Sequence, residues 1–107
     1  MILIIDKYKV ITLCGSTRFK EEFEKIQRKL TLEGNIVLSV GLFSHAEENG
    51  EEWADNGIKE MLDDIHKKKI DMSDEIFVIN KNGYIGKSTK SEIEYAKAKG
   101  KYINYLE

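Results

Sequence analysis

The chain has 107 residues, of which 41% are hydrophobic and 34% charged, with a formal net charge of −2. This composition fits one ordinary globular domain, residues 1–107, with enough chain for a single packed core. The slightly acidic balance and the lack of a long basic run give no indication of binding to the phosphates of a nucleic acid, so we expect no nucleic-acid polymer as partner. No run approaches the roughly 20 apolar residues of a membrane span, so we expect no membrane partner either.

The single cysteine, Cys14, cannot form an internal disulfide, which favours a reducing compartment, the cytoplasm. The apolar start, residues 2–5, is too short for a secretory signal and lacks a basic leader. We interpret Cys14 as a buried, inert thiol, because neither histidine is near it in the sequence. His45 and His66 are isolated and match no metal-ligand spacing, so no metal is expected.

The first half of the chain predicts a strand, a helix and a second strand. Residues 2–5 are either an edge strand or a lead-in, and Lys9 to Cys14 is the better central strand. The helix follows from apolar residues at i, i+4, i+7 and i+11, namely Phe19, Phe23, Ile26 and Leu30. Gly34 should end that helix, and residues 36–38 should form a buried strand.

The second half repeats this alternation after a long irregular segment. From Gly41 to Gly57, a stretch that includes Phe43 and Trp53, the pattern dissolves, and we expect a loop or lid over the site. Then follow, in order, a helix from Ile58 to about Met72, a strand at residues 76–79, a helix from about Thr89 to Lys99 and a strand at residues 102–106.

Alternating strands and helices predict an α/β fold, a three-layer open parallel sheet with right-handed crossovers and helices on both faces. In such sheets ligands bind outside the carboxyl ends of the strands. Residues 15–18 and 83–89 both leave a strand and enter a helix. They should therefore lie on one edge of the sheet, where we expect the functional site.

The turn at residues 15–18 has the features of an anion site. It combines a glycine turn at Gly15, the hydroxyl of Ser16, a helix N-terminus and the guanidinium of Arg18. The alternative is a simple helix cap with Arg18 in solvent.

The second loop contains Gly83 and Gly86, which allow the backbone to approach a ligand closely. Residues 86–89, with Ser88, copy the tail of a phosphate-binding P-loop, but Lys81 stands where its first glycine belongs, so a nucleotide triphosphatase is not expected. Tyr84 either stacks on a base or packs the loop down.

Glu92 has two interpretations. With Thr89 it fits the spacing of a capping box, in which its carboxylate reaches back to the helix start. Alternatively it is a carboxylate at the carboxyl edge of the sheet that attacks an anomeric carbon, as in retaining glycoside chemistry. Glu94 points away round the helix and should be exposed.

Three segments together resemble the nucleoside 2-deoxyribosyltransferase superfamily, which includes the 2′-deoxynucleoside 5′-phosphate N-hydrolases. The segments are Leu13-Cys14-Gly15-Ser16-Thr17-Arg18, then His66 with Ser73-Asp74-Glu75-Ile76-Phe77-Val78, then Gly83-Tyr84-Ile85-Gly86 with Glu92-Ile93-Glu94-Tyr95-Ala96 and Gly100-Lys101. The resemblance covers about residues 9–103, and the cysteine–glycine–serine turn with its arginine resembles the hydrolase branch.

This resemblance implies a flavodoxin-like fold and cleavage of the N-glycosidic bond of a nucleoside or nucleoside 5′-monophosphate, with no metal or organic cofactor. It implies that Glu92 is the nucleophile, that the turn at Gly15, Ser16 and Arg18 receives a 5′-phosphate, and that the protein is a homo-oligomer, a dimer or larger, with shared sites. The predicted catalytic residues are Glu92, His66 and Tyr84, and the predicted binding residues are Gly15, Ser16, Arg18, Gly83, Gly86 and Ser88.

The chain departs from the family pattern at two positions. Thr12 stands where the family has a tyrosine, and His66 stands where it has an aspartate that handles the leaving base. A histidine can donate a proton in that role, or His66 is a helix-flank residue beside Leu62 and Ile70. The alternative to catalysis is a nucleotide-binding or sensing domain of the same fold, or an assembly module.

Overall fold

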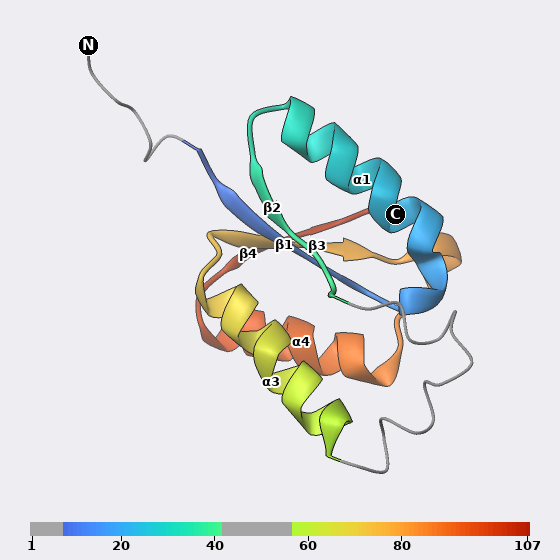
Figure 1. Ribbon diagram of the computed structural model, residues 1–107, viewed down its shortest axis with the longest axis vertical. Helices are drawn as coiled ribbons and strands as arrows, with labels where there is room; N and C mark the ends of the chain where they lie inside the picture. Colours follow the sequence, from blue (N-terminus) through green and yellow to red (C-terminus); the bar gives the residue numbers. More distant parts are fainter. Residues whose placement is uncertain (1–7, 42–56) are drawn as a thin grey trace.

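The computed structural model describes residues 8–41 and 57–107, which form a sheet with helices on either side (Figure 1). In chain order the elements are β1 (Val10–Gly15), η2 (Thr17–Phe19), α1 (Lys20–Leu32), β2 (Ile36–Leu38), α3 (Ile58–Asp71), β3 (Glu75–Ile79), η4 (Lys81–Gly83), α4 (Lys87–Ala98) and β4 (Tyr102–Tyr105). The predicted elements at residues 2–5 and the expected lid, with Phe43, His45 and Trp53, lie outside the described residues.

The four strands pair in the order β2-β1-β3-β4, and all pairs are parallel. The predicted parallel sheet is therefore confirmed. Successive side chains of a strand face opposite sides of the sheet. In β1, Ile11 and Leu13 join the apolar cluster that contains Phe23 of α1, whereas Cys14 joins the cluster that contains Ile93 of α4.

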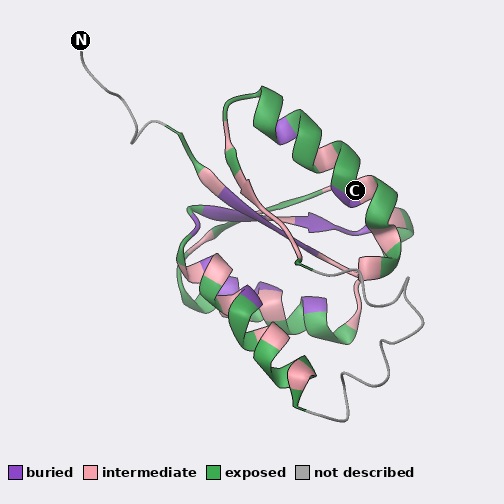
Figure 2. Cartoon of the chain, in the orientation of Figure 1, coloured by how far each residue is buried: buried purple, intermediate pink, exposed green. Residues whose placement is uncertain are grey.

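The helices cover both faces of the sheet, which gives the predicted three layers. Figure 1 shows α1 over one face and α3 with α4 over the other, as right-handed crossovers require when successive strands are added on opposite sides of β1. Figure 2 shows that burial is concentrated on β1, β3 and the inward sides of the helices. The two apolar clusters, one on each face, hold the layers together.

Two sequence-based expectations about the elements are wrong. The strand β2 is not buried: Ile36 is 47% exposed, because β2 lies at the edge of the described sheet and, within that part of the chain, pairs with β1 alone. The helix α4 begins at Lys87, two residues before Thr89, with Gly86 as N-cap and no side-chain capping bond. The predicted capping box between Thr89 and Glu92 is therefore absent, and Thr89 is buried.

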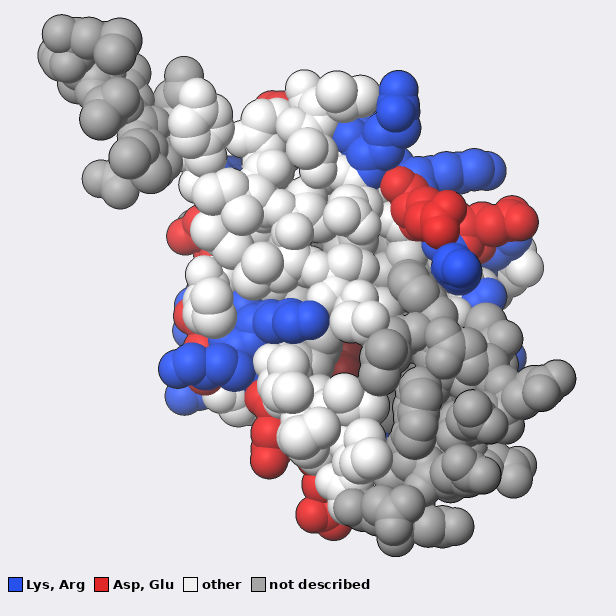
Figure 3. Space-filling model, in the orientation of Figure 1, with Lys and Arg blue, Asp and Glu red and all other residues white. Residues whose placement is uncertain are grey.

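Charged side chains of both signs lie next to each other over α1 on the face shown in Figure 3, as the small net charge suggests. Gly34 and Gly100 follow α1 and α4 with positive φ, as expected for residues that end a helix.

Within residues 8–41 and 57–107, no helix is both long and apolar enough to cross a membrane.

Candidate active site

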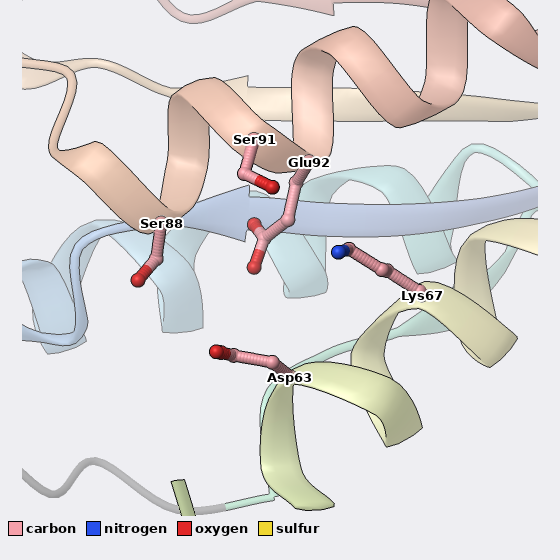
Figure 4. Close-up of a pocket in the computed structure, with 5 residues that line it drawn as sticks. All are labelled: Asp63, Lys67, Ser88, Ser91 and Glu92. Carbon is pink, nitrogen blue, oxygen red and sulfur yellow. The ribbon is translucent and has the colours of Figure 1, made fainter. Parts of the chain in front are cut away.

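Glu92 projects from α4 toward α3 into a small recess between the two helices (Figure 4). Its side chain is only 12% exposed. The recess, about 30 Å³ in volume, is lined by Asp63 and Lys67 of α3 and by Ser88, Ser91 and Glu92 of α4. Since the helix starts at Lys87, Glu92 does not cap it, and its carboxylate is available to the recess.

Glu92 belongs to a cluster of three side chains from three elements. The His66 Nε2 atom lies 3.8 Å from Glu92 Oε1 and 3.5 Å from the Cys14 sulfur. One ligand-type atom from each of the three residues lies within 4.8 Å of the others. The carboxyl end of β1 supplies Cys14, and one turn near the end of α3 supplies His66. The two look unrelated in the sequence, but the fold brings them together.

The environment of Glu92 favours its neutral form. Burial, with help from the nearby Asp63 carboxylate, raises the pKa of Glu92 from 4.5 to about 7. A hydrogen bond from Cys14 and the charges of Lys67 and Lys59 act in the opposite direction but do not cancel the effect of burial. At neutral pH the carboxyl group is therefore about half ionised.

The partners of Glu92 are neutral at pH 7. Burial lowers the pKa of His66 from 6.5 to about 4, an effect that the charge of Lys69 reinforces and a hydrogen bond with the Leu13 backbone opposes. Burial, followed by the charge of Glu92, raises the pKa of the Cys14 thiol well above its ordinary value. The close approach of His66 to Glu92 is therefore a polar contact between an uncharged imidazole and a carboxyl group, not an ion pair.

Helical spacing explains why α3 supplies several of these groups. Residues three and four apart share a helix face, so Asp63, His66, Lys67 and Ile70 form one stripe. Ile70 and His66 are buried at one end of the stripe, and Asp63 with Lys67 lines the recess. Sequence analysis did not single out Asp63, Lys67 or Ser91, although the spacing of Asp63 and Lys67 from His66 on one helix could have indicated these two.

The predicted anion turn follows β1 directly. The Ser16 hydroxyl oxygen accepts hydrogen bonds from the Arg18 backbone N–H at 3.3 Å and from Arg18 Nε at 3.1 Å. The Arg18 guanidinium stacks 4.4 Å from the centre of the Tyr84 ring. A Cβ atom at Gly15 would lie 2.8 Å from the Ile79 carbonyl oxygen, so only glycine permits this close approach of the two strand ends.

This turn has unused polar capacity. Arg18 is exposed and forms no ion pair with any acidic group among the described residues. The Thr17 hydroxyl is buried, and within the described chain it has no hydrogen-bond partner. Both groups follow Gly15, which is adjacent to Cys14 of the Glu92 cluster. The turn therefore directly follows the β1 residue that belongs to the Glu92 cluster.

The second loop brings some predicted residues together and separates others. Tyr84 contacts Arg18, and its hydroxyl oxygen would lie 3.3 Å from a Cβ atom at Gly86. Ser88 lies in a different place: together with Glu92 it lines the recess between α3 and α4. Gly83 is exposed, with a φ of 78° and open space around it, so it serves the turn of η4. Among the described residues, no contact of Gly83 supports its predicted role in ligand binding.

The fold and the site define a parallel α/β domain with a carboxylate, largely shielded from solvent, at the carboxyl edge of its sheet. A comparison with models of known protein families finds no match for this chain, and a comparison with curated protein sequences finds none either. The family resemblance carried by the motifs remains a prediction, and the function must be argued from the geometry of the site.

Proposed function

We propose that this protein cleaves the N-glycosidic bond of a nucleoside or nucleoside 5′-monophosphate, with Glu92 as the nucleophile. The observation that carries the proposal is the position of Glu92: a carboxylate largely shielded from solvent that does not cap its helix and faces a recess at the carboxyl edge of the sheet. A carboxylate in such a place can form a covalent glycosyl ester.

The proposed reaction has two steps. In the first, a Glu92 oxygen bonds to the anomeric carbon as the bond to the base nitrogen breaks, and the base leaves with the electron pair and takes a proton from solvent water. In the second, water attacks the same carbon, the bond to Glu92 breaks and the water's proton passes to solvent, or a second base attacks in place of water, loses its proton to solvent and takes the sugar. Glu92 must be ionised to attack, so its pKa of about 7 predicts a rate that rises with pH across neutrality.

The groups around Glu92 suit different parts of this reaction. His66 is neutral at pH 7, so we assign it to holding Glu92 in place and give it no part in supplying a proton. Asp63 and Lys67 of α3 line the side of the recess opposite Glu92. Under the proposal, the leaving base faces this side. The hydroxyl groups of Ser88 and Ser91 can bind the hydroxyl groups of a sugar.

The turn after β1 suits a 5′-phosphate. Its guanidinium has no acidic partner among the residues described, and the Tyr84 ring and Ser16 hydroxyl already hold it in one orientation. A positioned guanidinium loses less freedom on binding an anion than a free one. Under the proposal the phosphate binds Arg18 and the backbone of residues 15–17, the Thr17 hydroxyl gains a partner, and the sugar extends toward Glu92.

One assay separates the proposed enzyme from the alternative, a domain that binds nucleotides without cleaving them. Purified protein is incubated with a panel of nucleosides and nucleoside 5′-monophosphates, and free base is measured by chromatography with direct binding measured in parallel. Release of base supports the glycosidase. Binding without release would contradict it and support a sensor, and the absence of both would leave an interaction module.

A further inference from the structure

We propose that Cys14, His66 and Glu92 form a binding site for a borderline divalent cation of the Zn²⁺ class. The proposal starts from the types of atom that meet in the cluster: a sulfur, an imidazole nitrogen and a carboxylate oxygen from three separate elements. These are the three kinds of protein atom that bind zinc. The inference does not depend on the proposed glycosidase, because it concerns binding, which is measured without substrate.

The separations between the ligand atoms fit tetrahedral coordination. With zinc at its usual bond lengths, a sulfur and a nitrogen ligand lie roughly 3.6 Å apart, and a nitrogen and an oxygen ligand about 3.3 Å apart. The observed separations are 3.5 Å between Cys14 and His66 and 3.8 Å between His66 and Glu92. The first value already agrees, and a shift of the Glu92 carboxylate by about half an ångström would bring the second into agreement.

The charges of the cluster also fit a divalent cation. A thiolate and a carboxylate carry two negative charges and a neutral imidazole carries none, so a bound dication leaves a site without net charge. This matters because a buried charge without compensation is costly. The thiolate selects against Mg²⁺ and Ca²⁺, which prefer oxygen ligands alone.

Two surrounding features complete the site. The His66 ring also makes a hydrogen bond with the backbone of Leu13, and such bonds to a ligating histidine fix its orientation. Glu92 faces a recess of about 30 Å³, which is about the volume that one water molecule occupies in the liquid. A water molecule in this recess can be the fourth ligand. The arrangement is that of an open site with three protein ligands.

Cobalt(II) is the most direct probe, because it replaces zinc and is coloured. Protein stripped of metal with a chelator is titrated with Co²⁺ and then with Zn²⁺. We expect one equivalent of Co²⁺ to produce a thiolate-to-cobalt charge-transfer band and the visible bands of a tetrahedral ion, and Zn²⁺ to remove both. Wild-type protein that binds no Co²⁺, or binds it without the thiolate band, overturns the proposal, and neither result requires a variant.

Variants then assign the ligands by competition for Zn²⁺ with a chromophoric chelator. Cys14→Ser and Glu92→Gln should each weaken Zn²⁺ binding by roughly 100-fold or more. Loss of a residue that only hydrogen-bonds to a metal ligand already lowers metal affinity by about 10- to 100-fold. His45→Gln, which removes the other histidine of the chain, should bind as wild type does. Binding that survives both ligand variants, or is lost with His45→Gln, overturns the assignment.

The site and the proposed reaction share Glu92, so together they predict that zinc and turnover exclude each other. A carboxylate bonded to zinc cannot attack a sugar. Zinc should therefore inhibit base release in wild-type protein, and a chelator should restore it. Because metal binding is measured in the absence of substrate, failure of the metal site and failure of the glycosidase give different results.

Discussion

The Nε2 atom of His66 lies 3.8 Å from Oε1 of Glu92, yet burial shifts the pKa values of the two residues in opposite directions, to about 4 and about 7. Each group avoids its charged form inside the protein. The two pKa shifts change the free energy of unfolding in opposite directions as the pH varies. The contribution of each group becomes visible when the other group is replaced.

The first prediction concerns the pH dependence of stability. The Glu92 carboxyl ionises above pH 4.5 in the unfolded chain but keeps its proton to about pH 7 when folded, so its contribution to stability is lost as the pH rises through this window. His66 takes up a proton below pH 6.5 when unfolded but only near pH 4 when folded, so its contribution is lost as the pH falls. Between pH 4.5 and 6.5 the two slopes nearly cancel.

Replacing either residue removes this cancellation. Glu92→Gln should match wild type near pH 4.5 and exceed its free energy of unfolding by on the order of 3 kcal/mol above pH 7, from a shift of about 2.5 pKa units. His66→Gln should gain stability relative to wild type as the pH falls from 6.5 to 4. Urea unfolding at several pH values measures both, and parallel curves for variant and wild type would contradict the burial of the two groups.

The second prediction tests the phosphate turn. Arg18→Ala should weaken binding of a nucleoside 5′-monophosphate by roughly 10- to 100-fold, the range expected for a hydrogen bond to a charged group. The matching nucleoside should bind almost as before. Arg28→Ala removes an exposed guanidinium from α1 and serves as the control. Equal losses for the two ligands, measured by calorimetry, would place the phosphate elsewhere.

The third prediction concerns Asp63, which the sequence analysis did not single out. Asp63 lines the recess opposite Glu92, so Asp63→Asn should lower the rate of base release by about 100-fold if the carboxylate handles the leaving base. The effect should appear mainly in kcat, and Asp64→Asn, an exposed neighbour on the same helix, should leave kcat unchanged. A change in KM alone would limit Asp63 to binding.

The sequence predicted the order of the elements because apolar runs and helical stripes depend on local spacing. It failed at the start of α4, where Thr89 and Glu92 fit a capping box by spacing alone. In the structure Thr89 is buried and the Lys90 backbone N–H bonds to the Gly86 carbonyl at 2.9 Å, so the helix is already formed there. Packing against the sheet decided the start of α4, and capping propensity did not.

The site was only partly predictable for a related reason. Glu92, His66 and the turn at residues 15–18 carry local signals, such as a glycine next to a hydroxyl or a carboxylate near a helix start. The contact between Cys14 and His66 joins positions 52 residues apart and depends on α3 crossing to the face of β1 from which Cys14 projects. Spacing along the chain contains no information about that crossing.

The fourth prediction is a homodimer or larger assembly that includes the edge strand β4. Tyr102 is 78% exposed there, and among residues 8–41 and 57–107 β4 pairs with β3 alone, which leaves a strand edge for a second copy. Tyr105 is also exposed, whereas the Tyr95 hydroxyl already donates to Asp71 at 2.8 Å.

The test is sedimentation of Tyr102→Ser, which should already dissociate at concentrations where the wild type is still assembled. Ile36→Ser, which removes an exposed apolar side chain from the opposite edge strand, should not dissociate. A wild-type monomer at high micromolar concentration would contradict the assembly.

The last prediction is that Glu92→Gln yields a folded protein that binds ligand but does not turn over. A neutral amide cannot form the glycosyl ester, so the rate should fall by several orders of magnitude, about 5 kcal/mol or more in the barrier. Glu94→Gln removes the same charge two residues along α4, from a side chain that is 76% exposed, and should keep wild-type activity. Free base measured by chromatography compares the two variants.

A trapping experiment identifies the residue that forms the bond. A 2-fluoro-substituted nucleoside slows breakdown of a glycosyl-enzyme, so mass spectrometry should find the sugar on the peptide that contains Glu92 in wild type and in Glu94→Gln, and no adduct in Glu92→Gln. The adduct should form faster above pH 7, because only the ionised carboxylate attacks and the pKa of Glu92 is about 7. Wild-type turnover in Glu92→Gln, or an adduct on another peptide, would remove Glu92 from the reaction.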